Sequence, residues 1–389
     1  MRRMRQNKPS RRAPLFVLFA SLVAKSAAAD EVSEEPLDDP PPSVTPFGYA
    51  EIYIAHNFNE PANRVTNFRG FDNRSDTFAL SNAVVGVDAR AHRVSTHLAF
   101  QAGLTPDTYY ADEPMMAAAG NAPASSASLW KYIQEAYVGV DAAIGRGLTL
   151  QAGIFASPIG PEAFAVKDNW NWSRSNLFCA LPYYHAGVRA SYPLTTTWTA
   201  TVGVYNGWNN IIDNNEEKSV SAAMSYKSGS TFSFQALYFG GVERSHGAPE
   251  GAYFRHDVDA YAQLNATERL SFMAHLNGGL EPTRFGNSLF YGGALYARVQ
   301  PFSWLYLSAR GDRFYDDPAK NGVGAARPLF WNGSAWVSSA TATVDIRPAE
   351  FASIRLEFRH DAAEAPIYFA DFGNDSTQNT LLLGLTAWF

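Results

Sequence analysis

The fold of this chain is decided by a stretch that reads Phe351-Ala352-Ser353-Ile354-Arg355-Leu356-Glu357-Phe358-Arg359-His360-Asp361. Apolar Ile354, Leu356 and Phe358 alternate with charged residues. A β-strand sends successive side chains to opposite faces, so the pattern predicts one apolar and one ionic face. In a soluble sandwich the apolar face packs a core. In a transmembrane barrel it contacts lipid, and the ionic face lines a wet lumen.

Composition favours the membrane alternative. Charged residues make up 17% of the 389 residues and aromatic residues 14%. Soluble domains carry roughly 25% charged residues. Few charges and many aromatic rings suit a surface that contacts both lipid and the headgroup interface.

The N-terminal residues have the composition of a targeting segment. Residues 1–29 combine a basic head, a short apolar run and Ala27-Ala28-Ala29, which predicts a cleaved secretory signal peptide. Residues 30–46 are acidic and proline-rich and are expected to form a flexible periplasmic tail, before a barrel over 47–389. Cys179 is the only cysteine, which excludes an intrachain disulfide.

Alternating segments of about ten residues, the length a tilted strand needs to cross a bilayer, recur along the rest of the chain. They predict an all-β, antiparallel transmembrane barrel with strands near 47–58, 77–89, 94–104, 130–142, 147–157, 185–193, 197–208, 218–227, 231–241, 256–266, 269–280, 289–300, 304–314, 335–347, 350–361 and 378–389. Short connections alternate with long ones, which is typical of outer-membrane barrels with short periplasmic turns and long extracellular loops. Residues 281–288 are expected to form one of the shorter loops.

An even number of strands returns the chain to the side where it began. The first and last strands can then pair and remove the free edges that lipid does not tolerate. Sixteen strands enclose an aqueous channel. Aromatic residues beside the short turns, such as Trp198, Phe302 and Trp304, predict an interfacial girdle.

Several short motifs resemble the OmpL-like family of Gram-negative β-barrel porins. They are Gln134-Glu135-Ala136-Tyr137, Gly153 with Phe155 and Ile159-Gly160-Pro161-Glu162, Val204-Tyr205-Asn206-Gly207-Trp208, and Arg355 to Asp361. The chain end, Leu383 to Phe389, is similar to the terminal aromatic strand that the barrel-assembly machinery recognises. The resemblance covers most of residues 47–389 and implies an outer-membrane channel without indicating a solute.

The inward-facing charges are candidate pore-lining residues. They are Glu51, Glu135, Arg189, Asp257, Asp259, Arg298, Arg310, Asp312, Asp345, Arg355, Glu357, Arg359 and Asp361. Those on the twelfth to fifteenth strands form a mixed-sign ladder, because neighbouring strands are about 4.8 Å apart. The ladder either creates a transverse electric field at a constriction, or its opposite charges neutralise one another and only keep the inner wall hydrated.

Net charge predicts a mild preference for cations. Residues 1–29 contain seven of the 31 basic residues and none of the 37 acidic ones, so the processed chain carries a net charge of −13. The same charge argues against nucleic acid as a partner.

The longest predicted loop spans residues 158–184 and is rich in aromatic residues. Folding into the channel would bury these rings and narrow the pore, whereas packing over the outer rim or a partner subunit is the alternative. The candidate constriction residues are Lys167, Asp168, Trp170, Trp172 and Arg174.

No pattern predicts a catalytic residue, a metal site or a cofactor. Ser271, His275 and Asn277 are the types that a barrel esterase needs, but their two-residue spacing fits a polar wall better. The sequence therefore predicts a passive porin for small polar solutes, in contact with outer-membrane lipid and lipopolysaccharide and assembled as a homotrimer by analogy with other sixteen-stranded porins. The alternative is a non-conducting barrel for adhesion or envelope scaffolding.

Overall fold

The computed structural model describes residues 41–114 and 125–389, apart from residues 246 and 332. The predicted signal peptide therefore lies outside the described residues, as does most of the predicted tail. Within the described ranges, no helix has the length and apolar character needed to cross a membrane.

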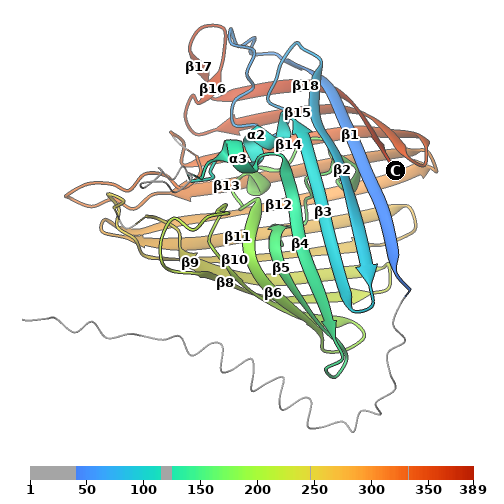
Figure 1. The fold of residues 1–389 in the computed structure, drawn as a ribbon. Helices are drawn as coiled ribbons and strands as arrows, with labels where there is room; N and C mark the ends of the chain where they lie inside the picture. Colours follow the sequence, from blue (N-terminus) through green and yellow to red (C-terminus); the bar gives the residue numbers. More distant parts are fainter. Residues whose placement is uncertain (1–40, 115–124, 246, 332) are drawn as a thin grey trace, which may run out of the picture.

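The wall of the molecule is a closed antiparallel barrel of sixteen strands (Figure 1). Its strands are β1 (Ser43–Asn57), β2 (Ala79–Ala91), β3 (Val94–Gly103), β4 (Ile133–Ala142), β5 (Leu148–Ala156), β6 (Tyr184–Pro193), β7 (Trp198–Tyr205), β8 (Ser219–Ser228), β9 (Phe232–Val242), β10 (Phe254–Asn265), β11 (Leu270–Thr283), β12 (Gly286–Phe302), β13 (Leu305–Asp317), β14 (Trp336–Ala349), β15 (Ala352–Ala363) and β18 (Thr377–Trp388). The short strands β16 (Tyr368–Phe369) and β17 (Asn374–Asp375) pair in a separate hairpin within the last loop. The predicted fold class and strand number are confirmed.

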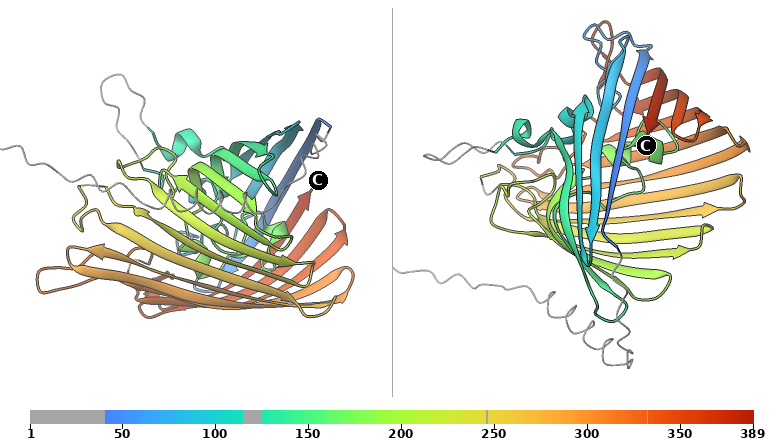
Figure 2. Two further views of the ribbon diagram at one scale, coloured as in Figure 1. Left: turned by 90° about the horizontal axis from the view of Figure 1, so that it is seen from below. Right: turned by 45° about the vertical axis from the view of Figure 1, so that its right-hand side comes forward.

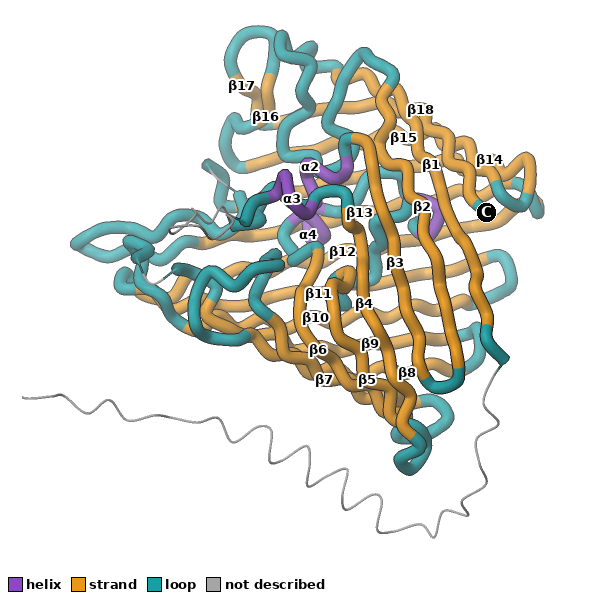
Figure 3. Tube along the Cα trace, viewed as in Figure 1, coloured by secondary structure: helices purple, strands orange, loops and turns teal. Residues whose placement is uncertain are grey.

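Among the described residues, short helices occur only in the connections between strands (Figure 3). They are α2 (Thr105–Tyr109), α3 (Ala127–Trp130), the 3-10 helix η1 (Val166–Asp168) and α4 (Asn176–Cys179). In the part of the chain that the structure describes, the wall is therefore entirely β, and the helical turns belong to its loops.

The two faces of the wall carry opposite chemistry, as the alternation predicts. On β15, Leu356 is 46% exposed on the outer face, whereas the neighbouring Arg355 and Glu357 are 0% and 1% exposed. The inner face is therefore polar and buried, and the outer face is apolar and exposed. Exposed apolar side chains on a closed barrel are suited to contact with lipid hydrocarbon.

Pairing between the first and last barrel strands closes the cylinder. β1 pairs antiparallel with β18, with Tyr49 opposite Trp388 and Asn57 opposite Thr380. The described start of the chain and its C-terminus consequently lie at the same end of the barrel (Figures 1 and 2). We call this end, which also carries the short turns, the short-turn end, and the opposite one the long-loop end.

The strand boundaries differ from the predicted ones by up to four residues, and two of these differences have a clear physical reason. β1 begins at Ser43 rather than residue 47, because residues 43–46 pair with residues 87–90 of β2. The loop predicted at 281–288 is instead a continuation of the hairpin, in which Thr283 pairs with Gly286. The Thr283 hydroxyl donates to the Gly286 carbonyl at 2.8 Å and accepts from the Phe285 amide at 3.1 Å, so a two-residue turn suffices.

Aromatic rings gather at the short-turn end of the wall. Trp198 and Tyr226 have ring centroids 4.8 Å apart, and Phe302 stacks on Trp304 at 5.6 Å. Phe302 and Trp304 are about half exposed. Such rings suit the interface between hydrocarbon and headgroups.

Candidate functional site

A ladder of opposite charges projects inward from β13, β14 and β15. In the strand register, Asp345 lies opposite Arg355, and Thr341 lies between Arg310 and Arg359. The Arg359 guanidinium contacts the Asp361 carboxylate at 2.7 Å, and Arg355 contacts Asp345 at 3.3 Å. The residues of this ladder are almost completely buried. Something other than open solvent must therefore cover them.

The cover is the loop of residues 157–183, which we call the lumen loop. Glu357 accepts hydrogen bonds from the backbone amides of Trp172 at 2.6 Å and Ser173 at 2.9 Å. Arg355 donates to the carbonyl oxygens of Val166 at 2.8 Å and Asn171 at 3.1 Å. The charges of the wall thus satisfy the backbone polar groups of a loop that would otherwise be buried without partners.

The same arrangement continues along the ladder. Arg310 donates to the carbonyl oxygens of Ser173 at 2.6 Å and Arg174 at 3.1 Å. Arg359 donates to the Arg174 carbonyl at 2.5 Å, and Asp312 accepts from the Asn176 amide at 3.1 Å. Several independent wall residues therefore bind one continuous segment of the lumen loop.

Contacts from two further strands show that the loop crosses the barrel interior. Glu51 on β1 accepts a hydrogen bond from the Val166 amide at 2.6 Å. Asp259 on β10 accepts from the Gly160 amide at 3.0 Å. Because β1 and β10 are far apart in the strand order, the lumen loop is held from several sides.

Most of the thirteen candidate pore-lining residues consequently contact protein rather than an open channel. Arg310, Asp312, Asp345, Arg355, Glu357, Arg359, Asp361, Glu51, Asp257 and Asp259 point inward but are buried. The sequence predicted that these residues line the pore, and it did not predict that the lumen loop covers them. Glu135, Arg189 and Arg298 keep partial exposure.

The five candidate constriction residues have different surroundings. Trp172 is fully buried, and its ring lies over Gly384, where an added Cβ would be 2.3 Å from the indole. Arg174 donates to the Trp172 carbonyl at 2.9 Å, and Trp170 packs against the Arg298 guanidinium at 4.6 Å. Lys167 pairs with Asp168 at 3.0 Å, and both side chains are partly exposed.

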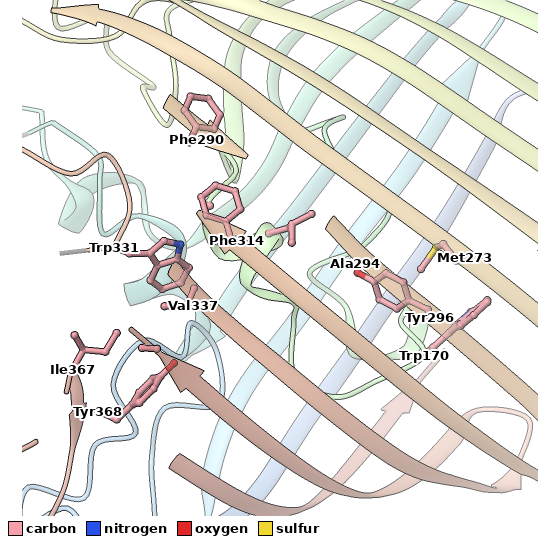
Figure 4. Close-up of a cluster of buried hydrophobic side chains, with 13 residues drawn as sticks. Trp170, Met273, Phe290, Ala294, Tyr296, Phe314, Trp331, Val337, Ile367 and Tyr368 are labelled. Atoms are coloured by element: carbon pink, nitrogen blue, oxygen red, sulfur yellow. The ribbon is translucent and has the colours of Figure 1, made fainter. Parts of the chain in front are cut away.

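Apolar clusters fill much of the long-loop half of the interior. One cluster joins wall residues such as Phe290 and Phe314 to Trp331 and Tyr368 from later loops (Figure 4). A second joins Phe71, Tyr109, Phe164 and Tyr183. These clusters were not predicted, although aromatic residues in several long loops were a usable signal. A channel through this half must pass beside a packed interior.

The short-turn half contains a cavity of about 450 Å³, which we call the short-turn chamber. It lies beneath the lumen loop, and its lining includes Phe47, Asp88, His97, Glu135, Glu162 and Asp168. Lys167, Trp388 and Phe389 also reach it. Only Glu135 and the pair Lys167–Asp168 were expected at a functional surface. Asp88 and His97 were missed because each is isolated in the sequence.

The described residues show no arrangement typical of catalysis. His275 contacts Asp259 at 2.6 Å and is buried, and four positions separate it from Ser271 along the same strand. Burial raises the pKa of the Cys179 thiol to about 11, which keeps it protonated at neutral pH. No group of three or more His, Cys, Asp or Glu side chains in the described ranges is placed to hold a metal.

A closed sixteen-stranded barrel with an apolar outside, a polar inner wall and an inserted loop defines a porin-type protein of the outer membrane. The sequence profile of the β-barrel porin-2 family, OmpL-like, matches residues 43–389. The chain belongs to this family, which confirms the resemblance seen in its motifs. A search of curated proteins found no match.

Solved structures of low sequence identity share the fold. The outer membrane channel DcaP of Acinetobacter baumannii has 10% identity and a TM-score of 0.57, with 90% of this chain and 98% of DcaP covered. The anion-selective porin from Comamonas acidovorans has 11% identity and the same TM-score, with 90% and 100% covered. The trimer form of OmpT from Vibrio cholerae has 9% identity and a TM-score of 0.58, with 90% and 100% covered.

Proposed function

We propose that the protein is a passive diffusion channel for small hydrophilic solutes and ions in the bacterial outer membrane. It needs no cofactor and performs no catalysis, because diffusion through a wet lumen requires no reacting group. Export through the Sec pathway and cleavage after residue 29 would deliver it there. The observation that carries this proposal is the inverted wall, in which Leu356 faces outward and Arg355 and Glu357 face inward.

The chamber supports a mild preference for cations. Its lining contains the carboxylates of Asp88, Glu135, Glu162 and Asp168 but one lysine, Lys167. Carboxylates at a pore mouth raise the local concentration of cations and lower that of anions. This local charge agrees in sign with the net charge expected for the processed chain.

Electrical recording tests both the channel function and the preference for cations. Purified protein is inserted into a planar bilayer, and current is measured under a KCl gradient. Discrete conductance steps with a reversal potential of cationic sign are expected. Steps with an anionic reversal potential would contradict the selectivity while leaving the channel intact.

A second candidate function is a non-conducting barrel used for adhesion or envelope scaffolding. The packed clusters of the long-loop half favour it, because Phe71, Phe290, Phe314 and Trp331 are buried inside the cylinder. Protein that migrates as a folded, heat-modifiable barrel on gels yet gives no current steps would identify this alternative.

Three partners follow from the proposed location. The exposed apolar wall would contact outer-membrane lipid, and the long-loop end would contact lipopolysaccharide. The barrel-assembly machinery would recognise the end of β18 and Phe389, which follows it, is 70% exposed and donates its amide to the Gly48 carbonyl at 3.0 Å. The trimer form of OmpT supports a homotrimer. Light scattering of the detergent-solubilised protein measures the subunit number.

A further inference from the structure

Four rings from neighbouring strands form a continuous column on the inner wall. The column consists of Phe47 on β1, His97 on β3, Tyr137 on β4 and Phe155 on β5. Successive ring centroids are 5.2, 5.0 and 5.1 Å apart. Among the first three rings, the planes of neighbouring rings differ by less than 20°. A column of this kind presents ring faces and edges in a fixed orientation.

A glycine on the intervening strand makes the column possible. Phe47 reaches from β1 across β2 to His97 on β3, and Gly86 on β2 lies directly beneath its ring. A Cβ at position 86 would come within 2.3 Å of the Phe47 ring. Any larger residue at this position would displace Phe47 from the stack.

The far end of the column already holds a cation of the protein itself. The Arg189 guanidinium carbon lies 4.2 Å from the Phe155 ring centroid and 5.6 Å from that of Tyr137. Cations within about 6 Å of a ring centroid are attracted by the electron density of the ring face. The Phe155 end of the column thus accepts a positively charged group, whereas Phe47 and His97 at the other end line the short-turn chamber.

Carboxylates flank the column where it borders the short-turn chamber. An Asp88 oxygen lies 2.7 Å from His97 Nδ1, and a Glu135 oxygen lies 3.9 Å from His97 Nε2. Asp88 is 58% exposed and Glu135 is 24% exposed. Ion pairs neutralise the charge of the two other chamber carboxylates: Glu162 pairs with Arg310 at 3.0 Å, and Asp168 pairs with Lys167. Asp88 and Glu135 thus supply accessible negative charge beside aromatic rings.

We propose that the short-turn chamber binds organic cations, namely molecules with an ammonium or guanidinium group on a compact apolar body. This inference rests on the proposed channel function and names the solute class that the channel handles. The cavity of about 450 Å³ is within the size range of small-molecule sites. Asp88 and Glu135 attract the charge, and the ring of Phe47, at the end of the column that lines the chamber, contacts the apolar body. Anions of the same size meet repulsion, and neutral molecules lose the electrostatic contribution.

Binding is measured by titration calorimetry on the full protein in detergent micelles, which does not require conduction. The probe is benzyltrimethylammonium, compared with benzenesulfonate and benzyl alcohol. We expect saturable binding of the cation, and no detectable binding of the anion. Equal binding of the three probes, or no binding of the cation at millimolar concentration, would overturn the inference.

Variants locate the site. Phe47→Leu removes the ring that lines the chamber while keeping apolar volume, and a double variant, Asp88→Asn with Glu135→Gln, removes the charge. Each is expected to weaken benzyltrimethylammonium binding by about two- to thirtyfold, as expected for loss of a cation–ring or charge contact. Glu350→Gln, at an exposed short turn away from the chamber, is the matched control and should bind normally. Unchanged affinity in both chamber variants would place the binding elsewhere and refute the assignment.

A bilayer recording separates this inference from the proposed function. Benzyltrimethylammonium added at the short-turn side should reduce the KCl current, and the reduction should be weaker in the chamber variants. Normal KCl conductance with neither block nor calorimetric binding refutes the organic-cation site and retains the porin. Calorimetric binding in a protein without conductance supports the site and refutes the channel.

Discussion

Glu357 is the wall residue whose replacement tests most directly whether charge holds the lumen loop inside the barrel. Its carboxylate accepts hydrogen bonds from the amides of Trp172 and Ser173 and from the Thr343 hydroxyl at 2.7 Å. In Glu357→Gln, one oxygen and the negative charge are lost, while the shape of the side chain is kept. A hydrogen bond to a charged group contributes about 1.5–3 kcal/mol. The equilibrium for loop release should therefore rise by about ten- to a hundredfold.

Limited trypsin digestion of the folded protein measures this release. Cleavage after Lys167 and Arg174 requires the loop to leave the lumen, since Arg174 is buried. Lys320, which is exposed in the loop between β13 and β14, is cut in either state and provides an internal reference. When opening and reclosing are faster than cleavage, the rate of cleavage follows the open population. The ratio of cleavage after Arg174 to cleavage after Lys320 should rise in the variant.

The control is Glu364→Gln. Glu364 accepts a hydrogen bond from the Ala335 amide at 3.0 Å but contacts no residue of the lumen loop in the described hydrogen bonds. Its replacement should leave the cleavage ratio unchanged. A ratio that also stays unchanged in Glu357→Gln would show that the ladder does not stabilise the inserted loop.

Three further predictions concern the packing of the lumen loop against the wall, the deletion of part of that loop, and an ion pair at the long-loop end of the barrel. Gly384→Val places a branched side chain where Trp172 lies, so the folded barrel should lose about 1–3 kcal/mol of stability; its melting temperature by heat-modifiable gel migration should fall, and an unchanged value contradicts the packing. Deleting residues 167–174 should raise single-channel conductance in protein that still migrates as a folded barrel, whereas unchanged conductance argues against a constriction. The Arg327 hydrogen bonds lower the pKa of Glu250 to about 2. Because the folded pKa lies below the usual value, this contribution is present at neutral pH and is lost as pH falls from about 4.5 to 2. Urea denaturation of Glu250→Gln should therefore vary less with pH over that window than wild type does, and equal pH dependence would refute the role.

The wall was predictable because lipid and water impose a strict two-residue period. Residues such as Ile354 and Leu356 must face hydrocarbon, and their neighbours must not, so the strands and their register follow from local sequence. The continuation of the β11–β12 hairpin was missed because Glu281 to Ser288 contains Pro282 and Gly286, which usually indicate a loop. Here the strands continue through them to a two-residue turn.

The interior was less predictable, because its contacts join residues far apart in the chain. The period shows that Arg355 and Glu357 point inward, but it does not show what they meet. Their partners in residues 166–173 come from a loop nearly two hundred positions earlier, with no periodic pattern of its own. The column of Phe47, His97 and Tyr137 likewise depends on side chains reaching across strands.

Pairing of β1 with β18 also constrains how the molecule is made. β18 is hydrogen-bonded on one side to β15 and on the other to β1, whose residues were synthesised more than three hundred positions earlier. Until that final segment arrives, the amides and carbonyls along both unjoined margins lack partners, which hydrocarbon penalises heavily. Assembly must therefore protect an open intermediate, and loss of the twelve residues of β18, Thr377–Trp388, would leave the facing edges of both β1 and β15 without partners.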